Sequence, residues 1–182
     1  MAKLVSKVYG EALFELAMEE QKAEPLMEEV EGVRRVFSEN PEFTGFLKHP
    51  GISKQEKLEV VKNVFQGRIS DEMIGFLEII LIKDRFGELE TIFQYFIDKI
   101  KEIKKIGTVY VTTAVELKDA QKAQIRTRLL ETTAYLTLEI HYDVNPEIIG
   151  GMIIRNKDRV VDSSIRTKLK DLTKQLLKIQ LG

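Results

Sequence analysis

Three side chains of the kinds that bind metal ions alternate along one stretch, where Glu139, His141 and Asp143 are separated by single residues. A period of two places all three on one face of a β-strand. Carboxylate and imidazole groups together can hold a transition-metal ion, so a metal-dependent enzyme using these residues is one hypothesis. Because the neighbouring residues provide no softer ligand and no evident partner to orient the imidazole, the pattern favours a solvated polar face.

The sequence contains no motif for binding a nucleotide phosphate. Neither GxxxxGK[ST] nor GxGxxG occurs, and the one glycine pair, Gly150-Gly151, is more typical of a bulge or turn entering a strand than of a phosphate cradle. The absence of cysteine excludes disulfides, thiol catalysis and thiolate metal sites. We therefore expect no cofactor, no bound metal and a protein that is not an enzyme.

The charge of the chain is unevenly distributed. Residues 1–105 carry 16 basic and 20 acidic side chains, whereas residues 106–182 carry 12 basic and 9 acidic ones, a net charge of +3. A dedicated nucleic-acid-binding protein is usually far more basic. A nucleic-acid-binding α/β module carried on a helical bundle nevertheless stays the alternative, and it predicts binding that weakens steeply with salt.

Residues 1–105 have the periodicity of helices. Apolar residues recur every three or four positions in six segments with short connections, which predicts a six-helix bundle. The first segment has a broad apolar stripe and the fifth, around Ile74 to Ile82, is apolar on nearly all sides, as in helices that meet a partner or lie at the centre of a core. The longest apolar run is far too short for a membrane span.

The period changes after Gly107, and this change predicts a second domain over residues 106–182. Val109, Val111 and Thr113 alternate with polar residues, as in a half-buried strand. The pattern as a whole predicts the order β-α-β-β-β-α. The fold class is therefore α+β multidomain, a helical bundle followed by a small α/β domain. The last helix has one apolar face, formed by Ile165, Leu169, Leu172, Leu176 and Ile179.

A long ordered string near the C-terminus carries a family resemblance. It consists of Ile149-Gly150-Gly151-Met152-Ile153-Ile154-Arg155, then Asp158, then Val161-Asp162-Ser163-Ser164-Ile165-Arg166, then Leu169 and Leu172. This string resembles the signature of the F-type ATP synthase delta subunit, the family of the mitochondrial oligomycin-sensitivity-conferring protein. Two shorter segments that also resemble the family, Tyr9 to Ala17 and Lys83-Asp84-Arg85-Phe86, extend the resemblance over the whole chain.

The resemblance implies a function. The chain is expected to be a non-catalytic stator subunit in the peripheral stalk of a proton-translocating ATP synthase. It would link the top of the catalytic head to the b-subunit stalk, so that rotor torque drives ATP synthesis. The expected location is the cytoplasmic face of the bacterial plasma membrane, held there only through the complex, with no nucleic acid among its partners.

The resemblance also implies two partner surfaces. A groove of the bundle would receive the N-terminal helix of an alpha subunit, bordered by Val5, Tyr9, Ala12, Leu13, Ile74, Leu77 and Leu81. The C-terminal domain would bind the b subunit through Arg155, Arg159, Ile165, Arg166, Leu169 and Leu172. Apolar contacts would provide most of the affinity and the arginines would pair with acidic residues at the rim.

Overall fold

The chain folds into two compact units, Met1–Ile100 and Lys101–Gly182, which we call the helical unit and the sheet unit. The computed structural model describes residues 2–157 and 159–180, and the side chains of residues 4–157 and 159–177. The turn residue Asp158 and the side chain of Ile179 lie outside these ranges. The division falls within the last turn of a helix, and the boundary expected between residues 105 and 106 stays a prediction.

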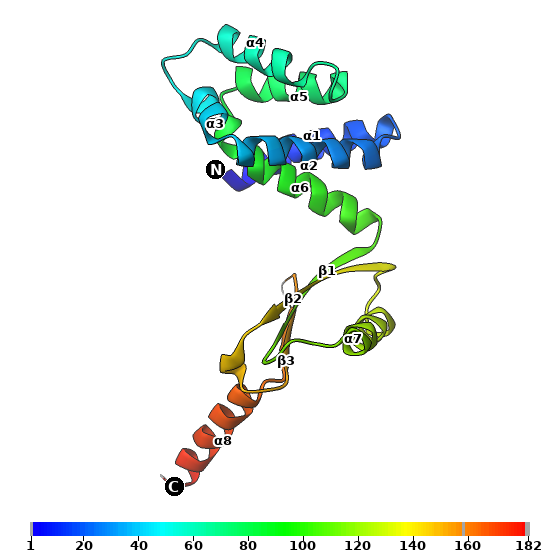
Figure 1. Ribbon diagram of the computed structural model, residues 1–182, viewed down its shortest axis with the longest axis vertical. Coiled ribbons are helices and arrows are strands. Elements are labelled where there is room, and N and C mark those ends of the chain that lie inside the picture. Colours follow the sequence, from blue (N-terminus) through cyan, green and yellow to red (C-terminus); the bar gives the residue numbers. More distant parts are fainter. Residues whose placement is uncertain (1, 158, 181–182) are drawn as a thin grey trace. The chain divides into compact units, whose positions relative to one another are not determined.

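The helical unit contains the six α-helices that the periodicity predicts, with one turn of 3₁₀-helix before the last (Figure 1). The elements are α1 (Ala2–Glu19), α2 (Ala23–Glu39), α3 (Pro41–Lys48), α4 (Lys54–Phe65), α5 (Asp71–Ile82), η1 (Phe86–Glu88) and α6 (Leu89–Ile103). The connections between consecutive elements have at most five residues, as at 49–53 and 66–70, so neighbouring helices are joined closely, as in other helical bundles.

The core of the helical unit is built around α5 and α6. The buried residues of α6 follow the helical spacing: Leu89, Ile92, Phe93, Phe96, Ile97 and Ile100. Six residues of α5 are also buried, but Ile79 and Ile82 of the same helix stay exposed. The all-round apolar character of α5 therefore provides both a core face and two apolar residues on the surface.

Side-chain caps fix the ends of several helices. Ser53 and Glu56 form a capping box at the start of α4, in which the Glu56 N–H donates to Ser53 Oγ at 3.2 Å and the Ser53 N–H donates to Glu56 Oε2 at 3.1 Å. Ser70 caps α5. Asn40 precedes α3, but its side chain does not cap that helix, because its amide donates to the Val36 carbonyl at 2.8 Å and caps the end of α2.

The sheet unit has the predicted order β-α-β-β-β-α. Its elements are β1 (Ile106–Thr113), α7 (Asp119–Thr132), β2 (Thr137–Val144), η2 (Pro146–Ile148), β3 (Met152–Asn156), β4 (Arg159–Asp162) and α8 (Ile165–Gln180). The strands lie in the order β2-β1-β3-β4, with β1 and β2 parallel and the other pairs antiparallel. The parallel pair needs a crossover, which α7 provides.

The core of the sheet unit is small. Val109, Val111 and Leu138 are buried, and α7 packs Ile125 and Leu129 against them. The buried residues of β1 alternate as predicted, since Tyr110 on the opposite face is exposed. No helix within residues 2–157 and 159–180 is long and apolar enough to cross a membrane.

Candidate functional site

The three residues proposed as metal ligands lie on β2, and two of them, Glu139 and His141, contact other side chains. The Glu139 carboxylate accepts a hydrogen bond from Lys101 Nζ at 2.7 Å, and the His141 ring stacks on Tyr110 with centroids 4.9 Å apart. The part of the chain that the structure describes contains no group of three or more His, Cys, Asp or Glu side chains placed to hold a metal. The geometry therefore gives the metal-enzyme hypothesis no support.

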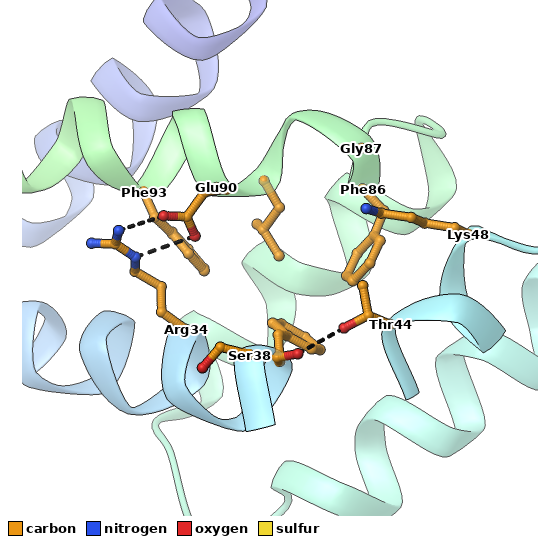
Figure 2. Close-up of a pocket in the computed structure, with 10 residues that line it drawn as sticks. Arg34, Ser38, Thr44, Lys48, Phe86, Gly87, Glu90 and Phe93 are labelled. Carbon is orange, nitrogen blue, oxygen red and sulfur yellow. Dashed lines mark hydrogen bonds and ion pairs between the residues drawn. The ribbon is translucent and has the colours of Figure 1, made fainter. Parts of the chain in front are cut away.

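A pocket of about 200 Å³ opens between α2, α3, η1 and α6 of the helical unit (Figure 2). The Arg34 guanidinium and the Glu90 carboxylate form a two-point ion pair across its mouth, with Nε 3.2 Å from Oε2. Aromatic rings of Phe86 and Phe93 form its wall. The ion pair holds α2 against α6, and its two charges neutralise one another. Since the ten lining residues also include neither histidine nor cysteine, the pocket offers no catalytic arrangement.

The glycine pair has a packing role at the junction between the hairpin and α8. A Cβ on Gly150 would lie 2.7 Å from the Ile165 Cδ1 atom, and one on Gly151, whose φ is +75°, would lie 2.4 Å from the Ser163 carbonyl oxygen. Only residues without a side chain permit this approach. The pair therefore allows α8 to begin directly against β3, and does not form a phosphate cradle.

Hydrogen bonds from the first turn of α8 converge on Asp162. The Ser164 N–H donates to Asp162 Oδ1 at 2.8 Å and the Thr167 hydroxyl donates to Oδ2 at 2.7 Å. Ser164 first, and then Thr167, hold the pKa of the Asp162 carboxyl below its usual value. The carboxylate thus fixes the start of α8, where a negative charge also complements the helix dipole.

The apolar face of α8 has no covering within the fold. Ile165, Leu169, Leu172 and Leu176 are 42–64% exposed, and none of the described side chains of this helix is buried. An amphipathic helix of 16 residues whose described apolar side chains all stay exposed is typical of an interaction surface. Three of the six residues predicted to bind the b subunit, Ile165, Leu169 and Leu172, lie on this stripe.

A hollow of about 450 Å³ lies beside α8 and joins apolar and basic groups. Ile149 and Leu169 line it together with the cations Arg166, Lys170 and Lys174. Ile149 has φ +69°, which is a rare conformation for a β-branched residue, and its side chain is exposed. Ile149 belongs to the family string, but the sequence assigns it no role, since nothing in the sequence marks an isoleucine for a positive φ.

The predicted basic rim does not form one cluster. The Arg166 guanidinium pairs with Glu147 at 3.0 Å, next to the hollow. Arg155 is opposite Val160 in the β3–β4 pairing, whereas Arg159 is opposite Asn156. Because paired residues share a face and consecutive residues alternate, Arg155 and Arg159 are exposed on opposite faces of the hairpin.

The residues expected to border a groove in the helical unit divide into three groups. Ala12 is exposed, and Val5 and Tyr9 are half-buried. The remaining four are buried in the core: Leu13, Ile74, Leu77 and Leu81. The exposed surface of α1 has two apolar residues that are absent from the expected set, Leu4 and Val8. They are 68% and 57% exposed and align with Ala12 at intervals of four. We call Leu4, Val8 and Ala12 the α1 strip.

Comparison with known proteins identifies the family. The sequence profile described as ATP synthase delta (OSCP) subunit matches residues 5–176, nearly the whole chain. The chain belongs to this family. Delta-family subunits are structural components of the stator, so the expected non-catalytic role in an F-type ATP synthase is confirmed, and the nucleic-acid alternative finds no support.

Similar proteins agree with the delta family over the full length. The chain is 53% identical over 182 residues to ATP synthase subunit delta of Lachnoclostridium phytofermentans, with 100% of both chains covered. It is 33% identical over 179 residues to that of Alkaliphilus oremlandii, covering 98% and 99%. A chain in the cryo-EM structure of the Toxoplasma gondii mitochondrial ATP synthase hexamer has the same fold, with a TM-score of 0.74, 23% identity, and 94% and 97% coverage.

Proposed function

We propose that this delta-family chain joins the catalytic head of an ATP synthase to its peripheral stalk, with one domain for each. Residues 1–105 bind the N-terminal helix of an alpha subunit, and residues 106–182 bind the C-terminal end of the b subunit. The mechanical reason is that rotor torque would otherwise turn the head together with the rotor. A protein that holds both head and stalk prevents this rotation, and it needs two docking surfaces but no catalytic group.

The uncovered face of α8 is the observation that carries this proposal. Its apolar stripe is long enough to pack along a partner helix over several turns, and the adjoining hollow supplies Ile149 and Leu169 as an apolar floor. Arg166, Lys170 and Lys174 surround that floor, so an amphipathic helix with acidic residues beside its apolar face fits best. The C-terminal helix of a b subunit is the proposed occupant.

The α1 strip is the corresponding surface of the helical unit. Leu4, Val8 and Ala12 present a narrow apolar line, and Val5 and Tyr9 flank it. The small side chain of Ala12 permits close approach of a second helix backbone. Of the residues expected at the groove, Leu13, Ile74, Leu77 and Leu81 are buried in the core and would not meet the partner directly. An amphipathic helix of the alpha subunit would lie along the strip, as in other helix-in-groove complexes.

The proposed location follows from the complex and from the bacterial relatives. The subunit would be peripheral, on the cytoplasmic face of the plasma membrane, and attached only through its partners.

Two substitutions in the full chain test the division of roles. Ala12→Asp should cost several kcal/mol of binding to the head, because the interface would bury an unpaired carboxylate, while stalk binding stays unchanged. Leu169→Asp should have the opposite pattern. Both positions are exposed, so both variants should fold like the wild type. Binding of each variant to the alpha-subunit N-terminal peptide and to the b subunit can be measured by calorimetry.

Deletion of residues 106–182 gives an independent check. The truncated chain should still bind the head and should lose the stalk. Retention of both partners, or loss of the same partner by both substitutions, would refute the proposed division.

A further inference from the structure

A second pocket of the helical unit, of about 250 Å³, shares no residue with the α1 strip or with α8. It lies where the end of α3, the start of α4 and the turn after α5 come together. Lys48, Lys54, Lys57 and Asp84 line it, and Leu81 and Phe86 contribute apolar wall. Asp84 and Phe86 belong to the segment Lys83-Asp84-Arg85-Phe86, to which the stator role assigns nothing.

Lys57 is the unusual residue of this pocket. Its side chain is only 8% exposed, although lysines are almost never buried without a partner. Among the residues that the structure describes, none forms a hydrogen bond or ion pair with the Lys57 ammonium. No described side-chain nitrogen is both sealed from solvent and unpartnered, so the ammonium must reach solvent. Lys57 lines this pocket, which opens to solvent.

The other charged groups make the pocket electropositive. Lys54, the first residue of α4, donates to the Ile82 carbonyl at the end of α5, and this bond holds its ammonium at the pocket. Lys48 is exposed at the end of α3. Three lysines and the single carboxylate of Asp84 give the lining a net charge of +2. A largely buried lysine that lines a cavity of this net charge, and that has no ion-pair partner among the described residues, forms a site that an anion would complete.

We propose that this pocket binds a small doubly charged oxyanion of the size of inorganic phosphate. The Lys57 ammonium is its central hydrogen-bond donor, and Lys48 and Lys54 flank it. An ammonium group offers three donors and a compact charge, which suits tetrahedral or carboxylate oxygens. The cavity is smaller than the roughly 300–1,000 Å³ of sites for larger organic ligands, so it suits the oxyanion alone and not a whole nucleotide.

Binding would connect three separate segments of the helical unit. The anion would contact residues from α3 and α4 and lie beside the turn after α5, so occupancy should stabilise the folded chain by mass action. This role is independent of the docking of head and stalk, and a failure of either proposal leaves the other standing.

Calorimetric titration of the full chain with sodium phosphate, against sodium chloride at equal ionic strength, tests the proposal. We expect saturable binding at one site and a rise in melting temperature with phosphate. Lys57→Met keeps the apolar stem and removes the ammonium, so it should weaken phosphate binding by about tenfold or more, the usual loss for a hydrogen bond to a charged group. Lys62→Met removes a lysine from the same helix but outside this pocket, and should bind like the wild type.

Succinate, titrated in parallel, shows whether the site selects phosphate or accepts small dianions in general. Binding of phosphate alone assigns the site to phosphate, and equal binding of succinate assigns it to small dianions in general. If neither binds to the wild type, the proposal is wrong. Should Lys57→Met fail to fold, Lys48→Met at the exposed rim provides the measurement, with an expected few-fold loss of phosphate affinity. Unchanged affinity in the lysine variants of the pocket that do fold would overturn the assignment.

Discussion

Gly10 on α1 lies against the ring of Tyr95 on α6, so closely that a Cβ on Gly10 would be 2.5 Å from Tyr95 Cδ1 and 3.1 Å from Tyr95 Cβ. The adjacent Glu11 carboxylate accepts a hydrogen bond from the Tyr95 hydroxyl at 2.6 Å. The same tyrosine thus fits against the glycine with its ring and binds the next residue with its hydroxyl. These contacts fix the rotation of α1, and hence the direction in which the α1 strip faces.

Gly10→Ala should destabilise the helical unit. Alanine in a helix gains up to about 1 kcal/mol over glycine, but the added methyl group would overlap the ring and the Cβ of Tyr95, and overpacking costs about 1–3 kcal/mol. Because the contact includes Tyr95 Cβ, turning the ring cannot relieve it fully, so we expect a net loss of about 1 kcal/mol in urea unfolding.

Gly32→Ala on α2 is the matched control. Nothing lies within 4 Å of the added Cβ, so only the helix propensity changes and stability should rise by about 0.5–1 kcal/mol. Equal effects of the two substitutions would show that the Tyr95 contact is unimportant.

Glu11 should make stability depend on pH. The Tyr95 hydroxyl first, and then Lys99 with its Nζ 3.2 Å from Oε1, hold the pKa of Glu11 below the ordinary value of 4.5. A lowered pKa in the folded state gives stability that is present above pH 4.5 and is lost as the pH falls through the folded value. Glu11→Gln should therefore be less stable than the wild type at pH 7, and the difference should disappear in acid.

Unfolding by urea at pH 7, 4 and 3 would measure this. Glu15→Gln, which removes an exposed carboxylate from the same helix, should leave the unfolding free energy nearly unchanged at pH 7. A wild-type advantage over Glu11→Gln that persists undiminished at pH 3 would contradict the expected linkage.

The helices α6 and α5 show how much apolar periodicity can predict. In α6 the apolar residues occupy one stripe, and that stripe is the buried face. In α5 nearly every side is apolar, so the pattern has no direction: Ile74, Leu77 and Leu81 were expected at a groove and lie in the core, whereas Ile79 is exposed. Which face meets the core is decided by the neighbouring helices, and the sequence of one helix does not contain that information.

The sequence also does not predict the unusual backbone conformation of a single residue or the burial of a single charged side chain. Lys57 lies within an ordinary amphipathic pattern, where a lysine predicts a solvated position, yet the fold buries it. Ile149, between η2 and β3, takes a positive φ against the preference of a β-branched residue. In each case the tertiary arrangement outweighs the intrinsic preference.

Gly151 and Gly67 allow two costs of replacing a glycine of positive φ to be separated, the backbone strain and the steric clash of the added Cβ. Both have φ near +75°, but a Cβ on Gly67 would meet nothing within 4 Å, whereas one on Gly151 would meet the Ser163 carbonyl oxygen. Gly67→Ala should therefore cost about 1–2 kcal/mol for the backbone conformation alone. Gly151→Ala should cost about 1–3 kcal/mol more, because the clash is with main chain that cannot rotate away. Circular dichroism during urea unfolding would compare them, and equal losses would mean that the junction before α8 adapts easily.

Leu169 should matter for binding and not for folding. Its side chain is half exposed on the uncovered face of α8, so Leu169→Ala should change the unfolding free energy by no more than about 0.5 kcal/mol. Leu138→Ala is the matched control, because Leu138 is in the core of the sheet unit and its truncation should cost about 2–5 kcal/mol. A large loss of stability in Leu169→Ala would instead make Leu169 a core residue.

Binding kinetics should separate the apolar and charged parts of the proposed stalk surface. Exposed ion pairs contribute only about 0–1 kcal/mol each, so the apolar stripe should supply most of the affinity for the b subunit. Leu169→Ala should mainly speed dissociation, since it removes contacts formed only in the complex. Arg159→Glu, on exposed β4, should mainly slow association and weaken its dependence on salt, since it reduces the long-range attraction of an acidic partner. Surface plasmon resonance at low and high salt would record both rates. If Arg159→Glu changed only dissociation, Arg159 would lie in direct contact with the partner, and the hairpin face that carries it would have to be included in the docking surface.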